Sequence, residues 1–385
     1  MIEVERAEGI FLYAPDGRCY FDLISGVAVS NVGHANPAVV QAVCEQAAAY
    51  MHVMVYGEVV ERPQVRYAAR IASLLPPALQ SVYFVNSGSE AIEGALKLAK
   101  RATGRMEIVS CTDAYHGSTH GALSVMGGEL FRGAFRPLLP GVRQIRFNRQ
   151  EDLAQITEHT ACVLMEPVQG EAGVRLPEAG YLEAVRERCS AVGALLIFDE
   201  IQTGMGRTGA LFAFQKYGAP APIHHGVTPD ILCVAKAFGG GMPLGAFIAS
   251  PELMGTLTNN PPLGHITTFG GHPVCCAAGL AALEYLLEHD LIAQVEAKGL
   301  LFEKLIGSHP LVKEVRRSGL LMAVELGDTA LRERVTEALK EAGVVTDWFL
   351  WCDTAFRIAP PLVITEEQVR EGASMILKVL DEGSP

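Results

Sequence analysis

The stretch Asp230-Ile-Leu-Cys-Val-Ala-Lys-Ala-Phe-Gly-Gly-Gly-Met-Pro-Leu-Gly245 brings one lysine, Lys236, to the end of a short apolar run and sets it before a cluster of glycines. The run at 231–235 has the length and composition of a buried strand. A lysine ammonium at the end of such a strand is unfavourable unless it is paired, neutral or able to reach water. Two interpretations are therefore open: a lysine that extends its amine to solvent, or one that forms a Schiff base with a carbonyl cofactor.

Other short apolar runs are built like this one and also end at polar residues or glycines; they lie at 82–85, 108–109, 162–165, 194–198 and 245–248. Helical patterns separate many of them, for example the apolar stripe of Ile92, Ala95, Leu96 and Ala99. Apolar strands that alternate with helices predict an α/β fold with a mostly parallel sheet buried on both faces. Ligands bind beyond the carboxyl ends of such strands, so we expect the chemistry at the polar residues that end these runs.

The chain of 385 residues is long enough for about two domains. We expect an N-terminal segment at 1–50, with a hairpin across Asp16-Gly17, that joins the smaller domain. A large domain at 51–275 would hold the sheet. A smaller α+β domain at 276–385 would follow, with strands near 312–315 and 320–326 and helices near 280–287, 292–305, 331–342 and 366–380.

Composition excludes several classes of protein. A formal net charge of −12 argues against nucleic acid or an anionic membrane as a partner. No apolar stretch approaches the roughly 20 residues of a membrane span, and the acidic N-terminus lacks a signal-peptide layout. The nine cysteines include no CxxC pair, so free thiols in the cytoplasm are expected. The histidines show no metal-ligand spacing, and no metal site is expected.

Three polar segments are candidates for binding or catalysis. The turn Asn86-Ser-Gly-Ser-Glu90 leads from a strand into a helix and suits a phosphate, or is an ordinary serine cap. Asp199, at the end of a central strand, suits a protonated heteroaromatic nitrogen or a helix cap, and nearby Gln202 suits a phenolic oxygen. Arg357, between apolar residues and before two prolines, suits a substrate carboxylate or a structural ion pair.

The segment Gly204-Met-Gly-Arg-Thr-Gly209 is a literal GxGxxG and supports one alternative, a nicotinamide-dependent dehydrogenase. That motif requires an immediate turn from strand to helix. Here a polar segment separates the strand from the first glycine, and no long helical pattern follows before Pro220. We therefore favour another interpretation of these glycines.

Together these segments resemble one family over nearly the whole chain: the class III (ω-amino acid type) aminotransferases, which depend on pyridoxal 5′-phosphate, in their ornithine, acetylornithine and ω-transaminase branch. The resemblance implies a fold type I homodimer with a shared active site. Seven ordered matches carry it: Asn86-Ser-Gly-Ser-Glu-Ala-Ile-Glu-Gly-Ala-Leu-Lys-Leu-Ala99, Ala114-Tyr-His-Gly117, Glu166-Pro-Val-Gln-Gly-Glu-Ala-Gly173, Phe198-Asp-Glu-Ile-Gln-Thr-Gly-Met-Gly-Arg-Thr-Gly209, Lys236, Thr267-Thr-Phe-Gly-Gly-His-Pro273 and Arg357-Ile-Ala-Pro-Pro361.

The resemblance assigns a role to each matched residue. Lys236 would form the Schiff base and move the proton, and Asp199 would keep the pyridine nitrogen protonated. Arg357 would bind the carboxylate of the oxo acid, and Glu171 would pair with it when a simple amine enters. Further residues would surround the cofactor: Tyr115 stacked on the ring, His116 beside it, Glu166 and Gln202 in the layer of Asp199, Ser87, Gly88 and Ser89 at the phosphate, and Thr268 of the partner subunit.

Ser118 departs from the family pattern. Ornithine and acetylornithine enzymes carry at this position an arginine that grips a second carboxylate. Its loss leaves His120 or Arg132 to read a distal carboxylate, or it favours a terminal amine or diamine as donor. His272 and Ile266 are further departures that could reshape the entrance, and Tyr56 is expected on the donor side.

The expected activity is a ping-pong transamination from an ω-amine, diamine or ω-amino acid to a 2-oxo acid, 2-oxoglutarate or pyruvate. An aminomutase or decarboxylase of the same fold is the alternative within pyridoxal phosphate enzymes. The pair of Glu171 and Arg357 favours transamination, because two different substrates must share one site.

Overall fold

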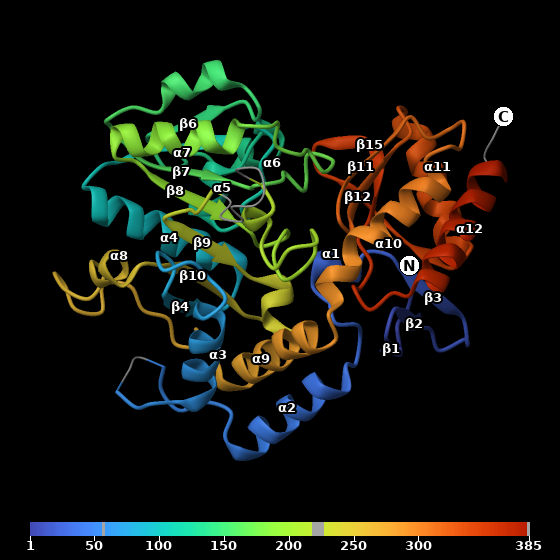
Figure 1. Cartoon of the computed structure of the whole chain (residues 1–385), viewed down its shortest axis with the longest axis horizontal. Coiled ribbons are helices and arrows are strands. Elements are labelled where there is room, and N and C mark those ends of the chain that lie inside the picture. Colours follow the sequence, from blue (N-terminus) through green and yellow to red (C-terminus); the bar gives the residue numbers. More distant parts are fainter. Residues whose placement is uncertain (56–57, 218–226, 383–385) are drawn as a thin grey trace.

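The computed structural model describes residues 1–55, 58–217 and 227–382, and its larger part is built on one seven-stranded sheet (Figure 1). Strand β10 runs antiparallel to both of its neighbours, and the other neighbouring strands are parallel. The α/β fold with a mostly parallel sheet is confirmed, although strand β6 was not predicted. In spatial order the strands are β4 (Ser81–Val85), β10 (Gly245–Ala249), β9 (Ile231–Val234), β8 (Leu195–Asp199), β7 (Thr160–Met165), β5 (Glu107–Cys111) and β6 (Val142–Ile145).

Both faces of this sheet are buried, because successive residues of each strand enter different cores. In β7, Val163 belongs to one hydrophobic cluster and Leu164 to the other. Helix α7 (Tyr181–Val192) packs with the first cluster and α4 (Gly88–Thr103) with the second (Figure 1). The other helices of this part are α3 (Arg62–Ala72), α5 (His120–Val125), α6 (Glu129–Arg132), α8 (Pro251–Gly255) and α9 (Pro273–Glu288).

The smaller part contains an antiparallel sheet in the order β11-β12-β15-β14, with Arg357 on β15. The sequence pattern did not predict β14 or β15, and it placed the start of the first strand of this sheet at 312 rather than at Glu314. The four helices predicted after residue 275 are present: α9, which packs in the larger part, and α10, α11 and α12. The elements are α10 (Leu291–Ile306), β11 (Glu314–Ser318), β12 (Leu321–Glu325), α11 (Thr329–Glu341), β14 (Asp347–Phe349), β15 (Cys352–Ile358) and α12 (Glu366–Glu382).

The N-terminal strands lie against the C-terminal part of the chain, as the blue and red ribbons in Figure 1 show. Strands β2 (Phe11–Tyr13) and β3 (Cys19–Asp22) form the predicted hairpin, β1 (Arg6–Glu8) extends it, and β3 pairs in parallel with β13 (Val344–Val345). Helix α2 (Pro37–Ala49) instead packs against α9. The three domain limits remain predictions.

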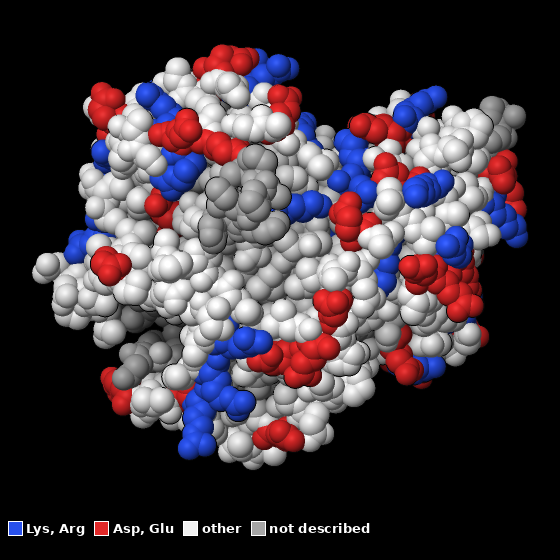
Figure 2. Space-filling model, in the orientation of Figure 1, with Lys and Arg blue, Asp and Glu red and all other residues white. Residues whose placement is uncertain are grey.

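Charged residues of both signs stand next to one another around much of the face drawn in Figure 2. Many form exposed pairs, such as Arg136 with Glu129 at 2.7 Å, and such pairs contribute little to stability. Within the three described ranges, the longest apolar helices fall short of what a bilayer crossing requires.

Candidate active site

A cavity of about 380 Å³ lies beyond the carboxyl ends of the central strands. Four polar residues that line it follow or end four different strands: Asn86 after β4, Glu166 after β7, Asp199 at the end of β8, and Lys236 after β9. These polar residues therefore meet at one edge of the sheet, the place where the sequence predicted the chemistry.

The turn between β4 and α4 forms one end of this cavity. Ser87 caps α4, because its hydroxyl accepts a hydrogen bond from the backbone N–H of Glu90 at 3.2 Å. The N–H groups at the start of a helix favour an anion, and Ser87, Gly88 and Ser89 all line the cavity. Gly117 packs so closely that a Cβ there would overlap the Ser89 hydroxyl. The serine cap is therefore present, and the use of the same turn as an anion site stays a prediction.

Asp199 and His116 form a buried pair at the centre of the cavity wall. The Asp199 carboxylate lies 2.7 Å from Nδ1 of His116, and its other oxygen accepts the N–H of Ile201 at 3.0 Å. Among the described residues, Nε2 of His116 has no partner. These contacts hold the Asp199 carboxylate in one orientation. His116 therefore binds Asp199 in addition to lining the cavity.

Glu166 and Gln202 complete this wall. Glu166 accepts backbone N–H groups from Gly170 at 3.0 Å and Tyr115 at 3.4 Å. Burial, reinforced by the nearby Asp199 carboxylate, raises the pKa of Glu166 well above its usual range. The amide of Gln202 donates to Glu171 at 3.2 Å, while its buried oxygen has no partner among the described residues. The amide oxygen of Gln202 can therefore accept a hydrogen bond from a ligand.

Lys236 lies in a short 3-10 turn (Lys236–Gly239) with a left-handed backbone, φ 51°. Burial lowers the pKa of its ammonium, and the nearby Glu171 carboxylate offsets part of that effect. No hydrogen bond joins its amine to the residues that the structure describes. Because Lys236 lines two adjoining cavities, its surroundings match an amine kept for a ligand better than one that extends freely to solvent.

A second cavity of about 690 Å³ adjoins the first and shares Tyr115, Glu171 and Lys236 with it. Most of its wall is apolar, from α5, α6 and β14. Besides the shared Glu171 and Lys236, four further polar or charged residues interrupt that wall: Ser118, His120, Asp347 and Arg357. The first cavity therefore suits a cofactor, and the second suits a substrate that reaches Lys236.

Arg357 and Glu171 form a buried ion pair beside the second cavity. Nη2 of Arg357 donates to Glu171 at 2.7 Å and to the carbonyl oxygen of Trp348 at 3.1 Å, and the guanidinium stacks 4.5 Å from the Phe349 ring centre. Burial alone would raise the pKa of Glu171, but Arg357 outweighs it and the pKa is lowered. Nε and Nη1 of Arg357 are buried without a partner among the described residues, so the guanidinium has two donors that Glu171 does not use.

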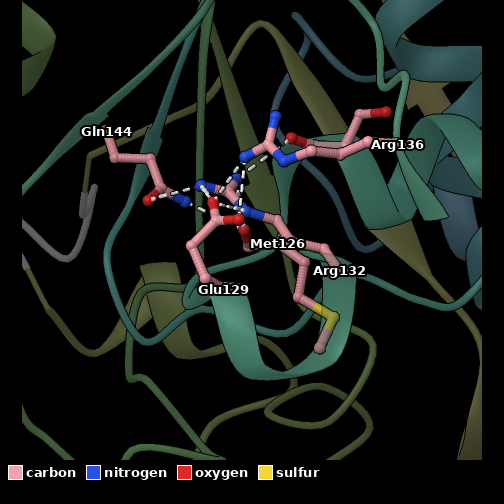
Figure 3. A network of polar contacts seen from close by, with 6 residues as sticks. Met126, Glu129, Arg132, Arg136 and Gln144 are labelled. Atoms are coloured by element: carbon pink, nitrogen blue, oxygen red, sulfur yellow. Dashed lines mark hydrogen bonds and ion pairs between the residues drawn. The ribbon is translucent and has the colours of Figure 1, made fainter. Parts of the chain in front are cut away.

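Ser118 and His120 line the second cavity, but Arg132 does not. The Arg132 guanidinium donates to Glu129 at 2.9 Å, to the Met126 carbonyl at 3.0 Å and to Gln144 at 3.4 Å, and Glu129 also binds Arg136 (Figure 3). The suggestion that Arg132 reads a distal carboxylate is therefore wrong, because its donors are already engaged.

Thr268 lies apart from both cavities in this chain, and its carbonyl oxygen accepts a hydrogen bond from His52 at 2.8 Å. Tyr56 lies outside the described residues. Sequence reasoning missed the helical turn α1 (Ser25–Ala28). Val27 within this turn and Val29 just after it line the cavities. The left-handed φ of 62° at Val27 is unfavourable for a β-branched residue. No pattern in the sequence predicts this backbone conformation.

The GxGxxG segment has a structural role. It forms a series of turns in which Arg207 is fully buried and donates to the carbonyl oxygens of Leu320 at 3.0 Å and Pro360 at 2.6 Å. Arg207 also binds Ser25 and Asn31. No α-helix follows these glycines before residue 217, so the requirement for a dinucleotide site is not met.

Comparison with known proteins agrees with this architecture. The sequence model of the aminotransferase class III family matches residues 1–380. Ornithine aminotransferase from Toxoplasma gondii is 31% identical, with 99% of this chain and 90% of that chain covered and a TM-score of 0.89. An (S)-enantioselective ω-transaminase from Thermomicrobium roseum is 29% identical, with 100% and 93% covered and a TM-score of 0.90. Adenosylmethionine-8-amino-7-oxononanoate aminotransferase from Methanocaldococcus jannaschii is 28% identical, with 99% and 93% covered and a TM-score of 0.89.

An α/β fold with a lysine, an aspartate and an anion-binding turn at one edge of the sheet defines a pyridoxal phosphate enzyme of fold type I. The chain belongs to the class III aminotransferases. It is therefore an aminotransferase of a pyridoxal phosphate-dependent family. The similar structures carry out different transaminations, so family membership does not determine the substrates.

Proposed function

We propose that the chain transfers an amino group from an ω-amine, diamine or ω-amino acid to 2-oxoglutarate or pyruvate in two alternating half-reactions. The buried pair of Glu171 and Arg357 beside Lys236 carries this proposal. With the pair intact, the cavity offers no unpaired arginine and suits an amine end. With the pair separated, Arg357 offers a fork that suits the carboxylate of an oxo acid.

The residues of the first cavity fit pyridoxal 5′-phosphate. Ser87, Gly88 and Ser89 would hold the phosphate at the start of α4. Gly117 lies so close to this turn that a side chain there would overlap the Ser89 hydroxyl. Tyr115 lines both cavities and would stack on the ring. When bound, the cofactor withdraws electrons from the carbon that carries the amine.

The remaining residues of the wall would orient and protonate. Asp199, held by His116 and by a backbone N–H, would bind the protonated pyridine nitrogen. Gln202 would direct its unpaired amide oxygen or its N–H toward the phenolic group, with Glu166 supporting this layer. Lys236 would anchor the cofactor and move the proton at the substrate carbon, because burial favours its neutral amine.

We further propose a homodimer in the cytoplasm, with Thr268 of the partner subunit at the phosphate. Two observations support the homodimer: Thr268 lines neither cavity of its own chain, and the chain resembles a dimeric family. An aminomutase or decarboxylase would need no second carboxylate-binding state, so the Glu171–Arg357 pair favours transamination. The GxGxxG segment does not support the nicotinamide alternative, because Arg207 within it joins parts of the fold.

A matrix of amino donors and oxo acids tests this proposal. The holoenzyme would be incubated with 4-aminobutyrate, ornithine, lysine, 1,4-diaminobutane or hexylamine as donor, and with 2-oxoglutarate or pyruvate as acceptor. We expect conversion of the acceptor to its amino acid with an amine-end donor. Turnover of none of these donors, or carbon dioxide release without amino transfer, would contradict the proposal.

A further inference from the structure

The substrate cavity contains a carboxylate that the proposed reaction does not use, Asp347 in β14. Asp347 lies directly opposite Arg357 in the register of β14 and β15, and opposed residues of antiparallel strands present their side chains on the same face. One of its oxygens accepts the N–H of Trp348 at 2.8 Å. Arg357 forms its ion pair with Glu171 instead, and no other cation in the described chain bridges to Asp347.

The charges of the cavity wall are therefore unbalanced. Glu171 neutralises Arg357 at 2.7 Å, and Lys236 is committed to the cofactor in the proposed reaction. Asp347 then remains as a carboxylate without a cationic partner among the described residues. Ser118 adds no charge. The cations Arg132 and Arg136 pair with Glu129 (Figure 3) and do not line the cavity. The wall thus favours a positively charged group beside Asp347.

The apolar part of the cavity wall suits a hydrocarbon chain. Leu123, Met126, Phe131, Phe135 and Trp348 line the same cavity. Methylene groups gain free energy when they are buried against such residues, and aromatic faces also attract an ammonium. A donor that combines an apolar chain with a cation at its far end matches both properties.

We infer that the preferred amino donor is an α,ω-diamine, whose reacting amine reaches Lys236 while its distal ammonium binds the carboxylate of Asp347. This inference rests on the proposed transamination and narrows its donor. An ω-amino acid would bring its own carboxylate beside Asp347, where like charges repel. A monoamine would bury apolar surface but leave Asp347 without a partner.

The test follows the first half-reaction of the holoenzyme, through the change in its visible absorbance, with diamines and monoamines of equal chain length. The probes are 1,4-diaminobutane, 1,5-diaminopentane and 1,6-diaminohexane against butylamine, pentylamine and hexylamine. We expect wild type to prefer the diamines. Asp347→Asn should lower that preference by about ten- to a hundredfold, the range of one charged hydrogen bond. The loss should lie in the concentration for half-maximal rate, and salt should reduce the preference of wild type.

Asp353→Asn is the matched control, because Asp353 lies exposed on β15 of the same sheet and lines neither cavity. It should keep the preference of wild type. The inference is overturned if wild type does not prefer diamines, if Asp347→Asn keeps the preference, or if Asp347→Asn slows only the half-reaction with the oxo acid. A protein that reacts with no amine of either series overturns the inference, and one that also fails with 4-aminobutyrate and ornithine refutes the proposed function as well.

Discussion

Glu171 accepts a hydrogen bond from Nη2 of Arg357 at 2.7 Å, although 186 positions separate the two residues along the chain. Both side chains are buried, and Gln202 and the N–H of Leu350 also bind the glutamate, at 3.2 and 3.4 Å. A buried charge that loses its partner is strongly destabilised. An arriving carboxylate must therefore replace Glu171 on the guanidinium, and Gln202 is already placed to keep Glu171 hydrogen-bonded.

Arg357→Ala should separate the two half-reactions. The half-reaction with a 2-oxo acid should slow by at least about tenfold, because a charged hydrogen bond contributes about 1.5–3 kcal/mol. The half-reaction with a simple monoamine should change less, since that substrate has no carboxylate. Rapid-mixing absorbance measurements on each half-reaction provide the comparison.

Arg316→Ala is the control for this change. Arg316 lies in the same sheet, pairs with Glu314 at 2.8 Å and Glu325 at 2.9 Å, and does not line the substrate cavity. Its removal should leave the ratio of the two half-reactions as in wild type. Equal slowing of both half-reactions by Arg357→Ala would show that the arginine is structural.

Gly117→Ala should weaken cofactor binding. Gly117 has a φ of 125°, and a Cβ there would overlap the hydroxyl of Ser89 in the phosphate turn. Gly17, in the N-terminal hairpin, has a φ of 87° and open space around its Cβ position. Both substitutions should cost about 1 kcal/mol of backbone strain. Only Gly117→Ala should also raise the Kd for pyridoxal phosphate, by roughly tenfold or more, measured by titrating apoenzyme. Equal affinities in the two variants would argue against the assigned turn.

Glu200 should make the stability depend on pH. Burial raises its pKa to about 7, from an ordinary value of 4.5, although backbone N–H groups of Phe214 and Ala213 bind it at 2.7 and 2.8 Å. The folded state favours protonated Glu200. The contribution of Glu200 to the free energy of unfolding is therefore full below about pH 4.5 and is lost as pH rises through about 7. The shift corresponds to about 3 kcal/mol at most, from 1.36 kcal/mol per pKa unit.

Denaturant unfolding of wild type and Glu200→Gln between pH 5 and 8, at one fixed cofactor concentration, checks this prediction. The wild type should lose more stability than the variant across this interval, since glutamine does not titrate. Curves that stay parallel would mean that Glu200 has an ordinary pKa in the folded protein.

Six of the seven strands of the large sheet could be predicted because each contains a short apolar run. The same pattern is enough to recognise Asn86, Asp199 and Lys236 as neighbours at one edge of the sheet. Strand β6 was missed because Arg143 and Gln144 interrupt its apolar pattern. Strand β15 was not recognisable, since Cys352, Asp353 and Thr354 interrupt its apolar pattern and are at least partly exposed. The substrate cavity depends on that strand.

Long-range contacts limited the prediction of the site itself. The pairing of Glu171 with Arg357 came from family resemblance, because no local pattern links residues so far apart. Asp347 was missed for a related reason: its importance comes from the register of β14 against β15, which places it opposite Arg357. The engagement of Arg132 by Glu129 is likewise visible only in the folded chain (Figure 3).

The proposed function depends most on Lys236 as the covalent anchor of the cofactor. Borohydride reduction of the holoenzyme, followed by proteolysis and mass spectrometry, should place the mass of the reduced cofactor on Lys236. Lys298 is an internal control, because it is also a buried lysine with a lowered pKa, but its amine donates to the Leu362 carbonyl at 2.9 Å. The label on Lys236 alone, lost in Lys236→Ala together with the visible band, is the predicted result. A label on another lysine, or an unchanged visible band in Lys236→Ala, would contradict the account.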